Sequence, residues 1–221
     1  MQEWWTYTLS DFLLFSPRAY YRLLERHNTQ LWPAHLLTLG LGLALLALVG
    51  RPAPWQGRIV AGAMAALWAW VGWAFIWRRY VTINWTAAYL VPLFALEALL
   101  LAWIGVLRVR LSFDARRGGA SGPIGIALVV LGLVLYPGLA PLLGRGWRHA
   151  EVFGMSPDPT AISTLGLLLL AEGRARWTLM AVPVLWCMLA GATLWAMRSP
   201  EAWVPLVAAL LGVAASGLKK P

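Results

Sequence analysis

The stretch LWPAHLLTLGLGLALLALVG, residues 31–50, carries no charged side chain and is long enough to cross a lipid bilayer as a helix. A transmembrane helix needs about 20 apolar residues, because each residue adds about 1.5 Å and the hydrocarbon core is about 30 Å thick. The stretch lacks the strict apolar–polar alternation of a membrane β-strand. In lipid, backbone N–H and C=O groups need internal partners, and a helix supplies them within one segment. The stretch therefore predicts a transmembrane helix.

The same pattern recurs along the chain. Uncharged runs lie at 59–77, 124–143, 177–197 and 202–218, and a run at 84–107 is interrupted only by Glu97. A further run, 159–171, would reach only about 20 Å as a helix, so it is either a short span or a re-entrant helix. We therefore expect an all-α, polytopic membrane protein with six to seven transmembrane helices, forming one bundle over residues 31–221.

The composition agrees with this fold class. Hydrophobic residues make up 60% of the 221 residues and charged residues only 12%, whereas soluble domains carry roughly 25% charged residues. The formal net charge is +9, which in a soluble protein would suggest nucleic-acid binding. Here the basic residues stand in pairs at the ends of uncharged runs, where such residues contact lipid headgroups. We therefore expect membrane lipids, and not nucleic acid, as partners.

Residues 1–30 form a separate N-terminal segment before the first run. Ser16-Pro17 is a good helix start, with a serine cap and a proline in the first turn. Arg18, Arg22 and Arg26 follow four residues apart, on one helical face. This pattern favours an amphipathic helix in the membrane interface with its basic face toward the headgroups, or a surface helix packed on the protein's own loops. The N-terminus lacks the basic region and cleavage site of a signal peptide, so no cleavage is expected.

Glu97 is one candidate for chemistry within the membrane. An ionised side chain at this depth costs about 2.5–3.5 kcal/mol on insertion scales, so the carboxyl is either protonated or paired across helices. His35, Ser163 and Thr164 are conceivable partners. The residue is a candidate for function, or for an interhelical hydrogen bond that fixes packing.

The segment FGMSPDPTAISTLG, residues 153–166, is the second candidate. Asp158 is predicted to cap a short helix with Pro159 in its first turn, and the start of such a half-helix can bind a polar group in a cavity. The plainer interpretation is that Asp158-Pro159 caps a helix that begins earlier or continues past Glu172. Together, the candidate polar intramembrane site comprises Glu97, His35, Asp158, Thr160, Ser163 and Thr164.

Metal and cofactor sites are not expected. Only one of the three histidines, His35, lies in an apolar run, so the chain cannot supply two axial haem ligands within the membrane. The chain has no HExxH, CxxC, phosphate-binding loop or GxSxG motif. Its single cysteine, Cys187, excludes an intrachain disulfide. We therefore predict no metal, no cofactor and no catalytic residue.

The N-terminal LSDFLLFSPRAYYRLLERHN followed by LWPAHLL resembles a family of uncharacterised bacterial membrane proteins, domain of unknown function family 6064. The dipeptides Ile83-Asn84, Tyr136-Pro137, Phe153-Gly154 and Pro159-Thr160 and the run LGLLLLAE share this resemblance, which covers nearly the whole chain. It implies a multi-span bacterial protein and no activity, and we expect this protein in the bacterial inner (cytoplasmic) membrane. The positions that carry it include Asn84, Tyr136, Pro137, Gly154 and Pro159.

Three functional hypotheses follow. The first is an accessory or scaffold subunit of a larger bacterial membrane complex, with other membrane subunits as partners, because catalytic motifs are lacking and small residues and tryptophans favour helix contacts. The second is a small channel or transporter for a proton, ion or small solute that uses Glu97 and the Asp158–Ser163 segment. The third is a lipid- or quinone-handling enzyme with Glu97 as acid or base. Function needs a site, and the sequence shows only fragments of one.

Overall fold

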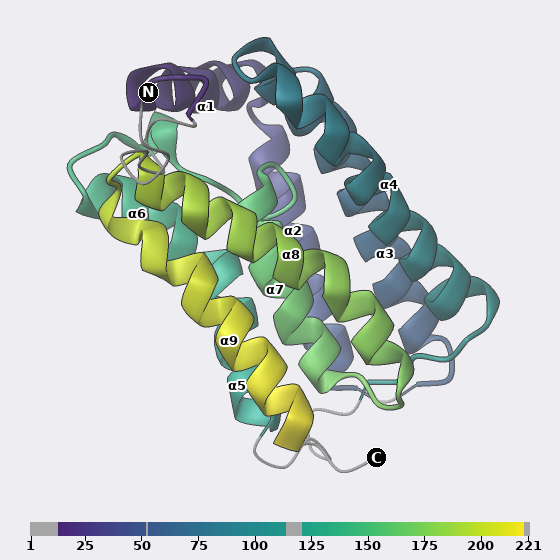
Figure 1. Cartoon of the computed structure of the whole chain (residues 1–221). Helices are drawn as coiled ribbons and strands as arrows, with labels where there is room; N and C mark the ends of the chain where they lie inside the picture. Colours follow the sequence, from purple (N-terminus) through teal and green to yellow (C-terminus); the bar gives the residue numbers. More distant parts are fainter. Residues whose placement is uncertain (1–12, 52, 114–120, 219–221) are drawn as a thin grey trace, which may run out of the picture.

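A computed structural model describes residues 13–51, 53–113 and 121–218, and over these residues the protein is helical, with a single isolated bridge between Phe113 and Ala171 in place of any β-strand (Figure 1). The all-α prediction is confirmed. The main helices are α1 (Pro17–Leu31), α2 (Ala34–Val49), α3 (Gln56–Val71), α4 (Val91–Leu100), α5 (Ser121–Val130), α6 (Tyr136–Leu142), α7 (Pro157–Leu170), α8 (Ala175–Ala196) and α9 (Trp203–Leu218). Three π-helical stretches extend them, η3 (Gly72–Trp77), η6 (Leu101–Leu107) and η7 (Leu131–Leu135), and short 3-10 turns are η4 (Tyr80–Thr82), η5 (Trp85–Leu90), η8 (Trp147–His149) and η9 (Pro200–Ala202).

Within the described residues, five helical segments are long and apolar enough to cross a membrane. A sixth arises if α1 and α2 count as one bent span. This agrees with a multi-span membrane protein, and the five segments overlap five of the predicted runs, whereas the run at 31–50 forms the 16-residue α2 after a break at Pro33. The five segments are Gln56–Thr82, Trp85–Leu107, Ser121–Leu142, Ala175–Ala196 and Pro200–Leu218.

The N-terminal helix α1 lies across one end of the bundle (Figure 1). It begins as predicted, because the backbone N–H of Ala19 donates to Oγ of the capping residue Ser16 at 3.2 Å. At Pro33 the chain turns by 88° into α2. α1 buries Tyr20 and His27 against the bundle and leaves its three arginines exposed. Residues 1–12 of the predicted N-terminal segment lie outside the described residues.

The short helix α7 lies at the centre of the bundle. All 14 of its residues are buried, and it packs on α5, α8 and α9 and also touches α3. The structure corrects the predicted cap: α7 begins at Pro157 with Ser156 at the capping position, so Asp158 lies in the first turn. An acidic side chain in the first turn is favoured by the helix dipole.

The segment that leads into α7 is irregular and runs through the interior. Residues 151–156 are all buried and non-helical. This segment starts near α1, where the Asn28 side-chain amide donates to the carbonyl oxygen of Ala150 at 2.7 Å. α7 ends at the opposite end of the bundle, where the backbone N–H of Glu172 donates to the carbonyl oxygen of Ser112 at 2.8 Å (Figure 1). The chain therefore crosses the bundle here, first as an irregular segment and then as a helix, and does not turn back.

Glycines allow α5 and the following η7 to approach α7 backbone to backbone. A Cβ atom on Gly166 would lie 2.6 Å from the carbonyl oxygen of Gly125, and a Cβ on Gly132 would lie 2.6 Å from that of Pro159. Small residues of this kind are typical of closely packed membrane helices. This contact fixes the register of α7 against the chain that continues into α6, where Tyr136 lies.

Candidate functional site: a buried acid beside an aromatic cavity

Asp158 is held in the interior by two donors from two other helices. The Tyr136 hydroxyl donates to Oδ2 at 3.0 Å, and the indole N–H of Trp186 donates to Oδ1 at 2.8 Å. One donor to each oxygen is an arrangement that stabilises a carboxylate anion. Trp186 lies near the middle of the 22-residue α8, so Asp158 sits at about half the depth of the bundle.

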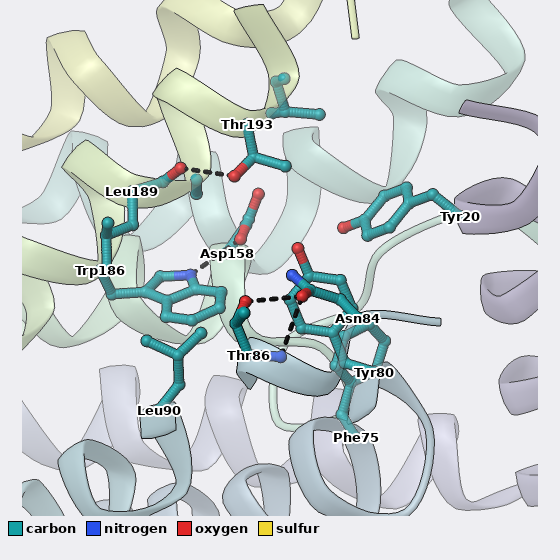
Figure 2. Close-up of a pocket in the computed structure, with 12 residues that line it drawn as sticks. Tyr20, Phe75, Tyr80, Asn84, Thr86, Leu90, Asp158, Trp186, Leu189 and Thr193 are labelled. Atoms are coloured by element: carbon teal, nitrogen blue, oxygen red, sulfur yellow. Dashed lines mark hydrogen bonds between the residues drawn. The ribbon is translucent and has the colours of Figure 1, made fainter. Parts of the chain in front are cut away.

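A cavity of about 230 Å³ opens beside this carboxylate (Figure 2). Its walls are mainly aromatic and hydroxyl or amide side chains, and among the described residues no basic side chain lines it. Tyr80 packs against both Tyr20 and Phe75, with ring centroids 6.2 and 6.4 Å apart. The lining residues are Tyr20, Phe75, Tyr80, Asn84, Thr86, Leu90, Asp158, Trp186, Leu189, Ala190, Thr193 and Leu194.

A second acid, Glu151, lies behind the cavity wall. The hydroxyl of Tyr20, a lining residue, donates to Oε1 of Glu151 at 3.1 Å. Oε2 has no hydrogen-bond partner within the described part of the chain. Burial, and then the neighbouring charge of Asp158, raise the pKa of the Glu151 carboxyl well above its usual range. Tyr20 therefore links the cavity lining to a second buried carboxyl group.

A third acid, Glu201, is neutralised by an arginine. Arg145 forms an ion pair with Oε1 of Glu201, and its guanidinium carbon lies 4.3 Å from the ring centroid of Tyr21. The Tyr21 hydroxyl shares a 2.7 Å hydrogen bond with Oγ of Ser199. This cluster ties α1 to the loop before α9, so it closes the α1 end of the bundle next to the acid site.

The hydroxyl residues of α7 are used inside the fold. Thr160 donates to the carbonyl oxygen of Ser156 at 2.7 Å and accepts the backbone N–H of Gly154 at 2.8 Å. Thr164 accepts the indole N–H of Trp68 at 3.0 Å. Ser163 faces Gly132 and its hydroxyl oxygen has no partner among the described residues. Thr160 and Thr164 therefore stabilise the irregular segment and the start of α7, and Asp158 is the residue of α7 that lines the cavity.

Glu97 and His35 lie apart from the cavity. Glu97 is fully buried on α4, and neither of its carboxyl oxygens has a hydrogen-bond partner in the described ranges. His35 instead bonds through Nε2 to Oδ1 of Asn28 at 3.1 Å. The six predicted polar residues thus divide into a cluster on α7 and two separate groups.

Several positions that carry the family resemblance meet at this site. Asn84 lines the cavity and caps η5, accepting the Thr86 hydroxyl at 2.6 Å. Tyr136 bonds to Asp158. Gly154 has a φ of +71°, a left-handed conformation that favours glycine, and Pro159 lies in the first turn of α7. Pro137 lines a different hollow with His35.

The residues that complete the site could not be connected to Asp158 from the sequence, although Tyr136 and Asn84 carry the family resemblance. Trp186 and Tyr136 come from distant helices, and Tyr20 comes from the predicted interfacial segment, so spacing along the chain does not join them. Glu151 lies in a segment that looks like an ordinary connection between two spans. The one local signal was the pair of prolines and the glycine around Asp158, which mark an interrupted helix.

The described residues contain no group of three His, Cys, Asp or Glu side chains that could hold a metal ion.

Comparison with known proteins places the chain in a family without assigning an activity. No curated protein and no solved structure matches it. A family of unknown function matches residues 18–219, nearly the whole chain, which includes the cavity, α7 and the N-terminal arginines. The chain therefore belongs to the family of unknown function DUF6064.

Proposed function

We propose that this protein is a multi-span protein of the bacterial inner membrane that binds a small organic cation in the Asp158 cavity and transports it. The observation that carries the proposal is a carboxylate beside an open, aromatic-lined cavity with no basic side chain in its described lining. Tyr, Trp and Phe rings attract ammonium groups through their electron-rich faces, and a carboxylate adds charge attraction. The second hypothesis drawn from the sequence is therefore retained for Asp158 and set aside for Glu97.

The depth of the site supports transport. Secondary transporters commonly bind solute near the middle of the bilayer, at helices that are interrupted there. Irregular backbone at membrane depth is tolerated where protein buries it or where it lines a cavity. The stretch 151–156 is irregular and buried by protein, and Asp158, in the first turn of the helix that follows it, lines the cavity.

The size of the cavity limits the solute. A volume of about 230 Å³ is below the usual range of roughly 300–1,000 Å³ for drug-sized ligands, so a compact amine fits better than a long or ring-fused one. The Asn84, Thr86 and Thr193 side chains add polar groups to the lining, among the aromatic rings (Figure 2). A cation that also carries a hydroxyl group matches this lining.

A binding experiment tests the proposal directly. The protein is purified in neutral detergent, and its unfolding midpoint is measured with choline and with 3,3-dimethylbutanol, which has the same shape without the charge. We expect choline to raise the midpoint and the neutral compound to have no effect. Asp158→Asn should abolish the shift, whereas Glu97→Gln, which changes a buried acid outside the cavity, should retain it. Elution volume in size-exclusion chromatography checks that both variants are folded.

Uptake into vesicles tests the transport step. Vesicles that contain the protein should accumulate labelled choline above empty vesicles, and Asp158→Asn should remove the difference. Equal shifts with choline and its neutral analogue, or an Asp158→Asn protein that binds as well as the parent, would refute the cation site. Binding without uptake would refute transport alone.

The accessory-subunit hypothesis has no comparable support. Large apolar side chains face outward on α2, α4, α8 and α9, which is also what a lipid-facing surface requires. A partner subunit is therefore not needed to explain them.

A further inference from the structure

A second hollow, of about 550 Å³, lies between α1 and the end of η3 and is lined by arginines from both. Arg18, Arg22 and Arg26 come from α1, and Arg78 and Arg79 come from the turn after η3. The remaining lining residues are small, polar or apolar, and none of those described is acidic. The helical spacing of the first three predicted a basic face, and the fold adds two further arginines opposite it.

The charges of these arginines are not compensated within the described chain. None of the five forms an ion pair there, whereas Arg145 and Arg148 at the same end of the bundle each face a glutamate. Arg79 donates to the side-chain amide oxygen of Gln30, and Arg78 lies over the Trp73 ring at 5.5 Å. These contacts orient two of the guanidinium groups and leave their charge intact. Like charges held around one hollow repel each other until an anion neutralises them.

The position of the hollow indicates where the anion comes from. α1 lies across the end of the bundle, nearly perpendicular to α2, as a helix in the membrane interface does (Figure 1). Trp73 and Trp77, on η3 next to Arg78, are about half exposed, and tryptophan is enriched at the headgroup level. The hollow therefore opens where phosphate groups of lipids lie.

We propose that this five-arginine hollow is a binding site for a phosphate group. Guanidinium groups bind phosphate oxygens through pairs of parallel N–H bonds, and several of them around one hollow can contact a single phosphate from different sides. A lipid headgroup and a soluble phosphate share this chemistry. The site is separate from the Asp158 cavity and does not depend on the proposed transport.

The test uses the full-length protein in neutral detergent. Binding of short-chain phosphatidylglycerol, short-chain phosphatidylcholine and inorganic phosphate is measured by calorimetry at fixed ionic strength. The test variant is Arg22→Ala/Arg78→Ala. The matched control, Arg51→Ala/Arg58→Ala, removes the same number of charges from exposed positions flanking the start of α3, at the far end of the bundle. Arg22→Lys/Arg78→Lys keeps the charge and removes the forked geometry.

We expect the test variant to weaken phosphate binding at least tenfold, the control variant to change it less than twofold, and the lysine variant to fall between them. Preference for phosphatidylglycerol over inorganic phosphate would assign the site to lipid headgroups, and the reverse would assign it to a soluble phosphate compound. Equal losses in the test and control variants would overturn the site in favour of general surface charge, as would undetectable binding of all three ligands. If the alanine variant does not fold, weaker binding by the lysine variant than by the control variant still supports the site, and equal binding by these two variants overturns it.

Discussion

Replacing Gly166 with alanine tests the packing that positions Asp158. The new Cβ would lie 2.6 Å from the carbonyl oxygen of Gly125 and 2.7 Å from the backbone nitrogen of Val129, both on α5. An unstrained contact is about 3.5 Å, so the two helices must separate by most of an ångström. Overpacking costs about 1–3 kcal/mol, and backbone atoms cannot rotate away as a side chain can, so the cost lies at the upper end. Alanine has a higher helix propensity than glycine, which offsets about 1 kcal/mol of this cost, so the net loss of stability is about 1–2 kcal/mol.

Gly40→Ala is the matched control. Gly40 lies within α2, and a Cβ there meets no atom within 4 Å, so only the gain of about 0.5–1 kcal/mol in helix propensity should appear. Equilibrium unfolding in mixed detergent measures both variants. We expect Gly166→Ala to lower the unfolding midpoint and to weaken choline binding, because α7 moves relative to Tyr136. An unfolding midpoint that rises equally in the two variants would show that α5 and α7 are not in backbone contact.

Three further predictions concern buried ionisable groups, each measured as unfolding stability in detergent. Folding raises the pKa of the Glu151 carboxyl, so the folded protein retains a proton that the unfolded chain releases, and stability should fall as pH rises above about 4.5. Glu151→Gln should abolish this fall between about pH 5 and 8, and an unchanged slope would show that Glu151 is not its source. Burial lowers the pKa of His27 from 6.5 to about 4, so as pH drops the unfolded chain binds a proton before the folded protein does, and stability should fall by about 3 kcal/mol between about pH 6.5 and pH 4. His27→Gln should reduce this loss of stability, and a parent protein equally stable at about pH 7 and pH 4 would refute the prediction. Glu97→Leu should leave the midpoint unchanged or raise it, because both carboxyl oxygens lack partners among the described residues; a fall of several degrees would reveal a partner.

The helices could be predicted closely from sequence because their signal is local. The length of each apolar run indicates the length of its helix, and a helix in lipid satisfies its backbone hydrogen bonds without a partner segment. The run at 159–171 is an example, since its shortness predicted an unusual element and the structure has a 14-residue helix there. Its start differs from the prediction because the helix begins two residues earlier, with Ser156 at the capping position and Asp158 in the first turn.

The site could be predicted only in part because its contacts are not local. Asp158 was recognised from the prolines around it, but its donors lie 22 and 28 residues away on other helices. Glu97 has the stronger sequence signal, a single acid in an apolar run, and lies away from the cavity. The arginine hollow is a second example. Helical spacing predicted that the three arginines of α1 share one face, whereas only the fold brings Arg78 and Arg79 next to them.

The irregular segment before α7 gives the strongest physical reason to look for function at Asp158. A connection between α6 and α7 through solvent would need no special support, because water satisfies exposed backbone groups. Inside the bundle the same groups need protein partners. Here the N–H of Gly154 bonds to the Thr160 hydroxyl, and the carbonyl oxygen of Met155 bonds to Nε2 of His27. Side chains of α1 and α7 thus stabilise a buried, irregular segment that a connection with no other role would not need. This segment places the Asp158 carboxylate beside the cavity, at about half the depth of the bundle.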